Sequence, residues 1–148
     1  MRVRRLLLYV LVTYFSCWSM IVTANENGLP TKTDVGGYWL NSVLLKPDSK
    51  SDLPPIVFLH GASTGLYDPM FSFRKKLEGR ATLLFVDRPG HGDSQAGGPQ
   101  NMLPDGQADA IAELMRLRGI KKAIVVGHSY GGSVQQHLPS VTLKRFWV

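Results

Sequence analysis

A serine between two glycines, directly after an apolar run, is the feature that most constrains this chain. Residues 123–126 read Ala-Ile-Val-Val, residues 127–131 read Gly-His-Ser-Tyr-Gly, and a further glycine follows at 132. The apolar run predicts a buried strand, and the small residues predict a sharp turn from that strand into a helix. Because glycine has no Cβ atom, the two glycines leave room for a strained backbone that holds the hydroxyl of Ser129 outward.

Short apolar runs alternate with amphipathic segments along the rest of the chain. Strands buried on both faces are predicted over 56–59, 81–86 and 123–126. Helices are predicted over 68–77, 105–118 and 132–138, an early antiparallel strand is predicted over 37–45, and 141–148 is compatible with one more strand. Strands that alternate with helices form right-handed βαβ units. We therefore expect an α/β fold, with a mostly parallel sheet and flanking helices.

Three glycine-rich loops follow the three buried strands, at 60–65, 87–94 and 127–132. In a parallel sheet the carboxyl ends of the strands meet at one edge, where ligands usually bind. The three loops are therefore expected to form one site. Within the second loop, Asp87 and Asp93 are expected to accept hydrogen bonds from the backbone of the turn.

A serine at such a turn suits nucleophilic attack, provided that a base removes its proton. The reaction also needs backbone N–H groups that stabilise the oxyanion formed on the substrate. The residue after the nucleophile, here Tyr130, supplies one of these groups, and a loop after an earlier strand supplies the other. The turn at His60-Gly61 places the N–H of Ala62 in that second role.

Three motifs, each at the end of a predicted strand, together resemble the α/β-hydrolase family. They are His60-Gly61, the pattern Asp-x-Pro-Gly-x-Gly-x-Ser at 87–94, and Gly-x-Ser-x-Gly at 127–131. The resemblance covers residues 37–135, and it implies Ser129 as the nucleophile, with Ala62 and Tyr130 as oxyanion donors. The elbow and loop residues that carry it are Gly127, His128, Gly131, His60 and Gly61. A serine at the elbow disfavours relatives with an aspartate nucleophile, the dehalogenase and epoxide-hydrolase types.

The chain departs from that family after the elbow, where the family places its acid and its catalytic histidine. No Asp or Glu follows Ser129, and the single later histidine is His137. A regular helix would separate the two residues by about 12 Å along its axis, whereas a base must lie within about 3 Å of the serine oxygen. We expect His60 to form structural hydrogen bonds, and the side chain of His128 to point away from the serine hydroxyl.

These observations predict the N-terminal portion of an α/β-hydrolase fold, with the C-terminal half missing. The expected function is that of a serine hydrolase that cleaves an ester or related acyl bond of a small-molecule substrate, impaired because the late acid and histidine are absent. The alternative is an inactive hydrolase fragment, or a binding or complementation module without catalysis. In each case the strand at 123–126 is expected at or near an exposed sheet edge, which favours self-association.

No cofactor or metal is expected. The four histidines lack the spacing of paired metal ligands. The glycines of 87–94 match a nucleotide-binding fingerprint only in part, because Gln95 stands at the third glycine position. The formal net charge is +6, and half of it comes from the arginines at positions 2, 4 and 5. Because no basic stripe with interleaved aromatic residues follows, nucleic acid is not an expected partner.

Residues 1–24 have the pattern of an export signal, with a basic start, an uncharged stretch at 6–24 and Ala24 before the expected cleavage point. The uncharged stretch is also long enough for an uncleaved membrane anchor. The protein is accordingly expected to be exported, to the periplasm or the extracellular space, or to be membrane-anchored through residues 6–24. Residues 25–36 are expected to be a linker, and 37–148 the truncated hydrolase domain.

Overall fold

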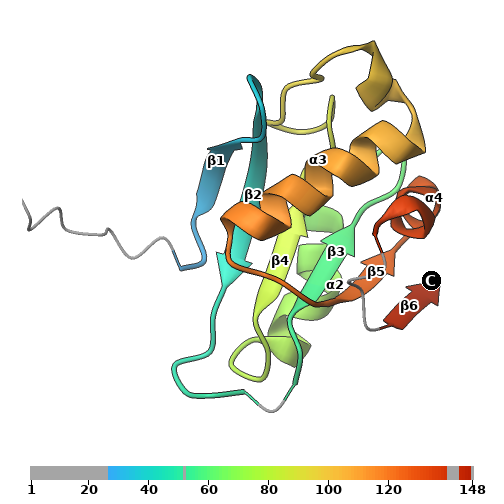
Figure 1. The fold of residues 1–148 in the computed structure, drawn as a ribbon. Helices are drawn as coiled ribbons and strands as arrows, with labels where there is room; N and C mark the ends of the chain where they lie inside the picture. Colours follow the sequence, from blue (N-terminus) through green and yellow to red (C-terminus); the bar gives the residue numbers. More distant parts are fainter. Residues whose placement is uncertain (1–26, 52, 140–143, 148) are drawn as a thin grey trace, which may run out of the picture.

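The computed structural model describes residues 27–51, 53–139 and 144–147. These residues form a six-stranded sheet in the order β1-β2-β4-β3-β5-β6, with helices on its two faces (Figure 1). In chain order the elements are β1 (Pro30–Asp34), β2 (Trp39–Leu45), β3 (Ile56–Leu59), α2 (Tyr67–Leu77), β4 (Leu83–Val86), the 3-10 helix η1 (Pro99–Met102), α3 (Pro104–Leu117), β5 (Ile124–Gly127), α4 (Tyr130–His137) and β6 (Lys144–Trp147).

The sheet is mixed, and its central strands are parallel. Strand β3 pairs in parallel with β4 on one side and with β5 on the other, and β5 pairs in parallel with β6. Strands β1 and β2 form an antiparallel hairpin whose second strand joins the sheet beside β4. The predicted α/β fold, with a mostly parallel sheet and flanking helices, is confirmed.

Alternating side chains of the central strands pack into two separate cores, one on each face of the sheet. In β3, Val57 and Leu59 face the core under α3 and α4, whereas Ile56 and Phe58 face the core under α2. The ring of Phe58 stacks between Phe73 and Phe85, at centroid distances of 5.1 and 4.7 Å. Residues 56–59 are continuously apolar because both faces of the strand are buried, as expected for a parallel sheet. Figure 1 shows α3 crossing one face and α2 lying against the other.

The hairpin differs from the expected organisation, because residues 30–34 of the predicted linker form strand β1. Its side chains alternate between exposed and half-buried positions, so no apolar run marks the strand in the sequence. The turn is closed by Asp34, whose Oδ1 accepts hydrogen bonds from the N–H groups of Gly36 and Gly37, at 2.8 and 2.7 Å. These two bonds hold the pKa of the Asp34 carboxyl below its usual range.

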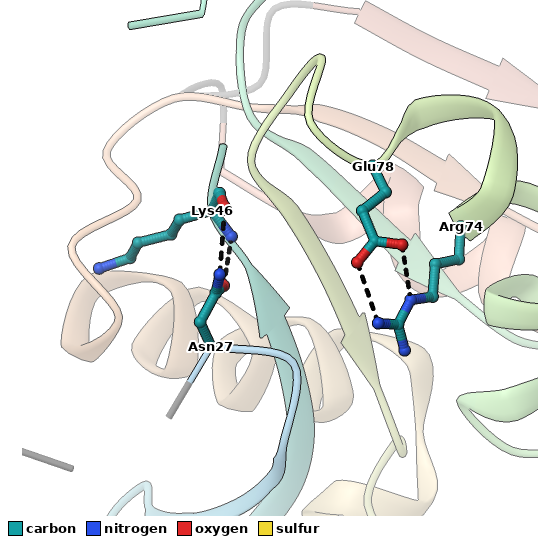
Figure 2. A network of polar contacts seen from close by, with 4 residues as sticks. All are labelled: Asn27, Lys46, Arg74 and Glu78. Carbon is teal, nitrogen blue, oxygen red and sulfur yellow. Dashed lines mark hydrogen bonds and ion pairs between the residues drawn. The ribbon is translucent and has the colours of Figure 1, made fainter. Parts of the chain in front are cut away.

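Figure 2 shows two exposed polar contacts of the structure. The side chain of Asn27 pairs with the backbone of Lys46: Nδ2 donates to the carbonyl oxygen at 3.2 Å, and Oδ1 accepts from the N–H at 2.6 Å. At the end of α2, Nε and Nη2 of Arg74 each donate to the carboxylate of Glu78 at 2.9 Å. The first contact fixes the chain entering β1 to the end of β2.

Strand β5 lies next to the edge strand β6, which agrees with the expectation that 123–126 is at or near an edge of the sheet. Its register pairs Ile124 with Lys144 and Gly127 with Trp147 of β6, so the two outermost described strands are β1 and β6. Residues 144–147 add this outer strand inside the segment 141–148, whose sequence is compatible with one more strand. The predicted leader at 1–24 lies outside the described residues. Within the described part of the chain, no helix is both long and apolar enough to cross a membrane.

Candidate active site

The turn between β5 and α4 holds Ser129 in a strained conformation. Its backbone has φ +50° and ψ −117°, and it is the one non-glycine residue with positive φ in the described ranges. Such strain persists only where the surrounding structure imposes it, and it is often found at functional sites. A Cβ atom at Gly131 would lie 2.3 Å from the carbonyl oxygen of Leu59, and one at Gly127 would lie 2.5 Å from the carbonyl oxygen of Gly131. Both glycines of the motif are therefore required by main-chain contacts.

The loop after β3 lies directly against this turn. The N–H of His128 donates to the carbonyl oxygen of Leu59 at 3.0 Å. A Cβ atom at Gly61 would lie 3.0 Å from Nδ1 of His128 and 3.6 Å from Cβ of Ser129. Ala62 follows at an exposed position. The structure thus brings the first and third predicted motifs together at one sheet edge.

Tyr130 is the first residue of α4, so its backbone N–H has no acceptor within the helix. The N–H groups at a helix start carry partial positive charge and favour a bound anion. Its phenol donates to the carbonyl oxygen of Met102 at 3.0 Å, and its ring is half-buried against the α3 side of the sheet. Both expected oxyanion donors, Ala62 and Tyr130, line a pocket of about 350 Å³ beside the elbow.

His60 is completely buried, and both of its ring nitrogens are engaged. Nδ1 donates to the carbonyl oxygen of Gly61 at 2.7 Å, and Nε2 accepts from the backbone N–H of Arg88 at 3.0 Å. Burial lowers the pKa of the His60 imidazole to about 4. His60 is therefore neutral at pH 7 and has no free nitrogen to receive the proton of Ser129.

Arg88 is a site residue that sequence reasoning missed. Its side chain is completely buried, although it is charged and lies in a glycine-rich loop. Nε donates to the carbonyl oxygen of His60 at 2.9 Å, Nη2 to that of Gly61 at 2.8 Å, and Nη1 to Oε1 of Gln107 at 2.6 Å. Its guanidinium carbon lies 4.9 Å from the centre of the Tyr130 ring. Burial lowers the pKa of Arg88 to about 10, so it remains a cation at pH 7. In the sequence, the one indication that Arg88 belongs to the site is its position next to Asp87 in the second glycine-rich loop.

Asp87 stabilises the second loop, as expected. Its Oδ1 accepts from the N–H of Leu66 at 2.7 Å, and its Oδ2 accepts from Nδ2 of Asn41 and the N–H of Asp93, at 2.8 and 3.1 Å. A Cβ atom at Gly92 would lie 2.3 Å from the carboxylate. Asp93 contributes its backbone N–H, not the carboxylate that was expected to accept.

The family model described as the alpha/beta hydrolase family matches residues 56–145. This chain belongs to the alpha/beta hydrolase family. Pimeloyl-[acyl-carrier protein] methyl ester esterase of Chromobacterium violaceum is 40% identical to this chain over 85 residues, which are 57% of the chain and 30% of that esterase. The epoxide hydrolase CorEH has a TM-score of 0.66 at 25% identity, covering 80% of the chain and 41% of that structure. Cfl2 from Burkholderia cenocepacia has a TM-score of 0.71 at 20% identity, covering 80% and 40%. The chain thus spans less than half the length of these relatives.

All four histidines of the chain lie among the described residues, and none forms a hydrogen bond with the Ser129 hydroxyl. Nδ1 of His91 contacts the carbonyl oxygen of Pro89 at 3.0 Å, and Nε2 contacts that of Ala62 at 2.9 Å. His128 and His137 are exposed, and His137 ends α4. Among the described residues, no group of three or more His, Cys, Asp or Glu side chains is placed to hold a metal ion.

Proposed function

We propose that this chain carries the nucleophile and the oxyanion hole of a serine hydrolase that acts on ester or related acyl bonds. The observation that supports this most directly is the backbone of Ser129, held at φ +50° between a buried strand and the first turn of α4. Ala62 and Tyr130 line the adjacent pocket, and their N–H groups are the proposed oxyanion donors. The curated relative described above is named an esterase, which agrees with an acyl substrate.

In the proposed reaction, Oγ of Ser129 bonds to the carbonyl carbon of the substrate, and the carbonyl oxygen becomes an oxyanion. The N–H groups of Ala62 and Tyr130 stabilise that charge. The intermediate then expels the alcohol or other leaving group, and an acyl-serine remains for water to hydrolyse. The proton of Ser129 needs an acceptor, and none of the four histidines is in place for it. We therefore propose that the 148 residues alone turn over little or no substrate.

The alternative is an inactive hydrolase fragment, or a binding or complementation module that does not catalyse a reaction by itself. In complementation, a second polypeptide would supply the acid and the base. The outermost strand β6 offers a parallel edge at which further strands could join the sheet. We also keep the proposal of an exported or membrane-anchored protein, which rests on the sequence of residues 1–24.

Adding a small base to the solution distinguishes the catalytic function from the non-catalytic alternative. The chain is incubated with an activated small ester, with and without added imidazole, and the acyl adduct is mapped by peptide mass spectrometry. The proposed function predicts an adduct on Ser129 that forms faster with imidazole, because the small base replaces the missing acceptor. Ser129→Ala removes the adduct, and the matched exposed variant Ser72→Ala leaves it unchanged. No adduct on Ser129 under either condition would support the non-catalytic alternative.

A further inference from the structure

We propose that Arg88 is the positioning residue of the oxyanion hole, because its guanidinium fixes both the Gly61–Ala62 peptide and the Tyr130 side chain beside Ser129. The inference rests on the proposed function of Ser129 and adds a residue to it. It concerns how the two N–H donors are held in one geometry, although they come from loops more than sixty residues apart in the sequence.

Arg88 first fixes the planar peptide group between Gly61 and Ala62. The carbonyl of Gly61 and the N–H of Ala62 belong to one trans peptide, so they point in opposite directions. Two donors bind that carbonyl oxygen: Nη2 of Arg88 at 2.8 Å and Nδ1 of His60 at 2.7 Å. These bonds fix the rotation of the peptide plane and therefore the direction of the Ala62 N–H. A cationic donor on the carbonyl also polarises the peptide and strengthens its N–H as a donor.

The neighbouring carbonyls are fixed as well. Nε of Arg88 donates to the carbonyl oxygen of His60 at 2.9 Å, so one guanidinium holds two successive peptide planes. On the other side, Nε2 of His91 contacts the carbonyl oxygen of Ala62 at 2.9 Å. The guanidinium presents its donors in a rigid planar fork that matches the two adjacent carbonyls, and a lysine ammonium lacks that fixed geometry.

Arg88 also contacts the side chain of Tyr130. The guanidinium lies over its ring at 4.9 Å, and the phenol donates to the carbonyl oxygen of Met102 at 3.0 Å. The ring is therefore held at its face and at its tip. Because the ring and the backbone N–H belong to the same residue, this also restrains the start of α4, where the second oxyanion donor lies.

The charge of Arg88 suits this role. The two ion pairs of the described residues are Arg74–Glu78 and Arg116–Glu113, so no carboxylate there neutralises the Arg88 guanidinium. A buried cation without a carboxylate partner is costly to the folded state. In the proposed reaction, negative charge develops in the adjacent pocket that Arg88 lines, and a fixed positive charge stabilises it there.

The test uses a thiol as the nucleophile, because a thiol ionises in solution without a catalytic histidine. In the full chain with Ser129→Cys, the new thiol is alkylated by iodoacetamide, which forms no oxyanion, and acylated by p-nitrophenyl acetate, which does. Both rates are measured on the peptide that contains position 129, by mass spectrometry. We expect Arg88→Met to lower the acylation-to-alkylation ratio at least tenfold, and Arg88→Lys to lower it by a smaller factor. Arg80→Met, which removes an exposed arginine, should leave the ratio unchanged.

Circular dichroism melting shows whether each variant is folded at the assay temperature. If Arg88→Met does not fold, Arg88→Lys and Tyr130→Leu are compared instead. Arg88→Lys removes the planar fork that binds the two carbonyls, and Tyr130→Leu removes the ring next to the guanidinium. Both variants keep the backbone N–H groups. An unchanged ratio in the folded Arg88 variants would overturn the positioning role. If the thiol of the Ser129→Cys chain shows no higher ratio than free N-acetylcysteine under the same conditions, the oxyanion hole itself is absent, and the proposed function fails together with this inference.

Discussion

The guanidinium of Arg88 lies over the ring of Tyr130, with 4.9 Å between its central carbon and the ring centre. The two residues belong to the loop after β4 and to the first turn of α4, and they meet beside Ser129. A buried cation on an aromatic face contributes to stability as well as to geometry. The contribution of Tyr130 to stability therefore has two separable parts, one from the hydroxyl group and one from the ring.

Tyr130→Phe should lower the free energy of unfolding by about 0.5–1.5 kcal/mol, because it removes the hydrogen bond to the carbonyl oxygen of Met102. Tyr130→Leu should cost about 1–2 kcal/mol more than Tyr130→Phe, because it also removes the ring under the Arg88 guanidinium. Urea denaturation at pH 7 measures both values. Equal stability of the Phe and Leu variants would show that the cation–π contact contributes nothing.

His60 should make the fold sensitive to moderate acid. Its pKa is lowered from 6.5 to about 4 in the folded chain, mainly by burial. Between these values the unfolded chain binds a proton and the folded chain does not, so the free energy of unfolding falls as the pH falls. The loss is at most roughly 1.4 kcal/mol per pH unit for this single group.

The check is the difference in unfolding free energy between pH 7 and pH 5. His60→Asn should reduce that difference, whatever its own stability at pH 7, and the exposed His137→Asn should not. If wild type and His60→Asn lose the same free energy over this interval, burial of His60 is not the cause of the acid sensitivity.

We expect the side chain of Gln135 to lower the free energy of unfolding. It is completely buried in α4, and its Oε1 and Nε2 find no hydrogen-bond partner among the described residues. A Cβ atom at Gly127 would lie 2.7 Å from Oε1, so the amide lies directly beneath the elbow. Gln135→Met keeps the shape and removes the unpaired amide, and we expect it to raise the unfolding free energy by about 1–3 kcal/mol.

Thermal or urea melts of Gln135→Met and of the exposed neighbour Gln136→Met provide the comparison. The Gln136 variant should change stability by less than about 0.5 kcal/mol. A loss of stability in Gln135→Met would mean that the amide is hydrogen-bonded in solution, for example to a buried water.

The sequence predicted the parts of the fold that one local pattern determines. The continuous apolar runs located β3, β4 and β5 to within two residues, because strands buried on both faces have no polar positions. The glycines at 127 and 131 likewise indicated the elbow, since the structure leaves no space for a Cβ atom at either position. These features leave a recognisable pattern within a short stretch of the sequence, even where the contact that requires them, such as that of Gly131 with Leu59, comes from far along the chain.

The features that sequence reasoning missed depend on residues far apart in the chain. Strand β1 is an edge strand with partly exposed side chains, so its pairing with β2 leaves no apolar pattern. Arg88 is buried because the carbonyls of His60 and Gly61 and the Tyr130 ring surround it, and none of these lies near it in sequence. A charged residue in a glycine-rich loop is normally predicted to be exposed.

The central claim is that the strained turn holds Ser129 in position to act as a nucleophile, while none of the four histidines of this chain is placed to accept its proton. The most direct test is the rate of Ser129 phosphonylation by a fluorophosphonate between pH 5 and pH 10, mapped by peptide mass spectrometry. We predict labelling at Ser129 that rises steadily with pH and shows no inflection between pH 5 and pH 8. An inflection in that range that disappears when one of the four histidines is replaced, or labelling that survives in Ser129→Ala, would contradict the claim.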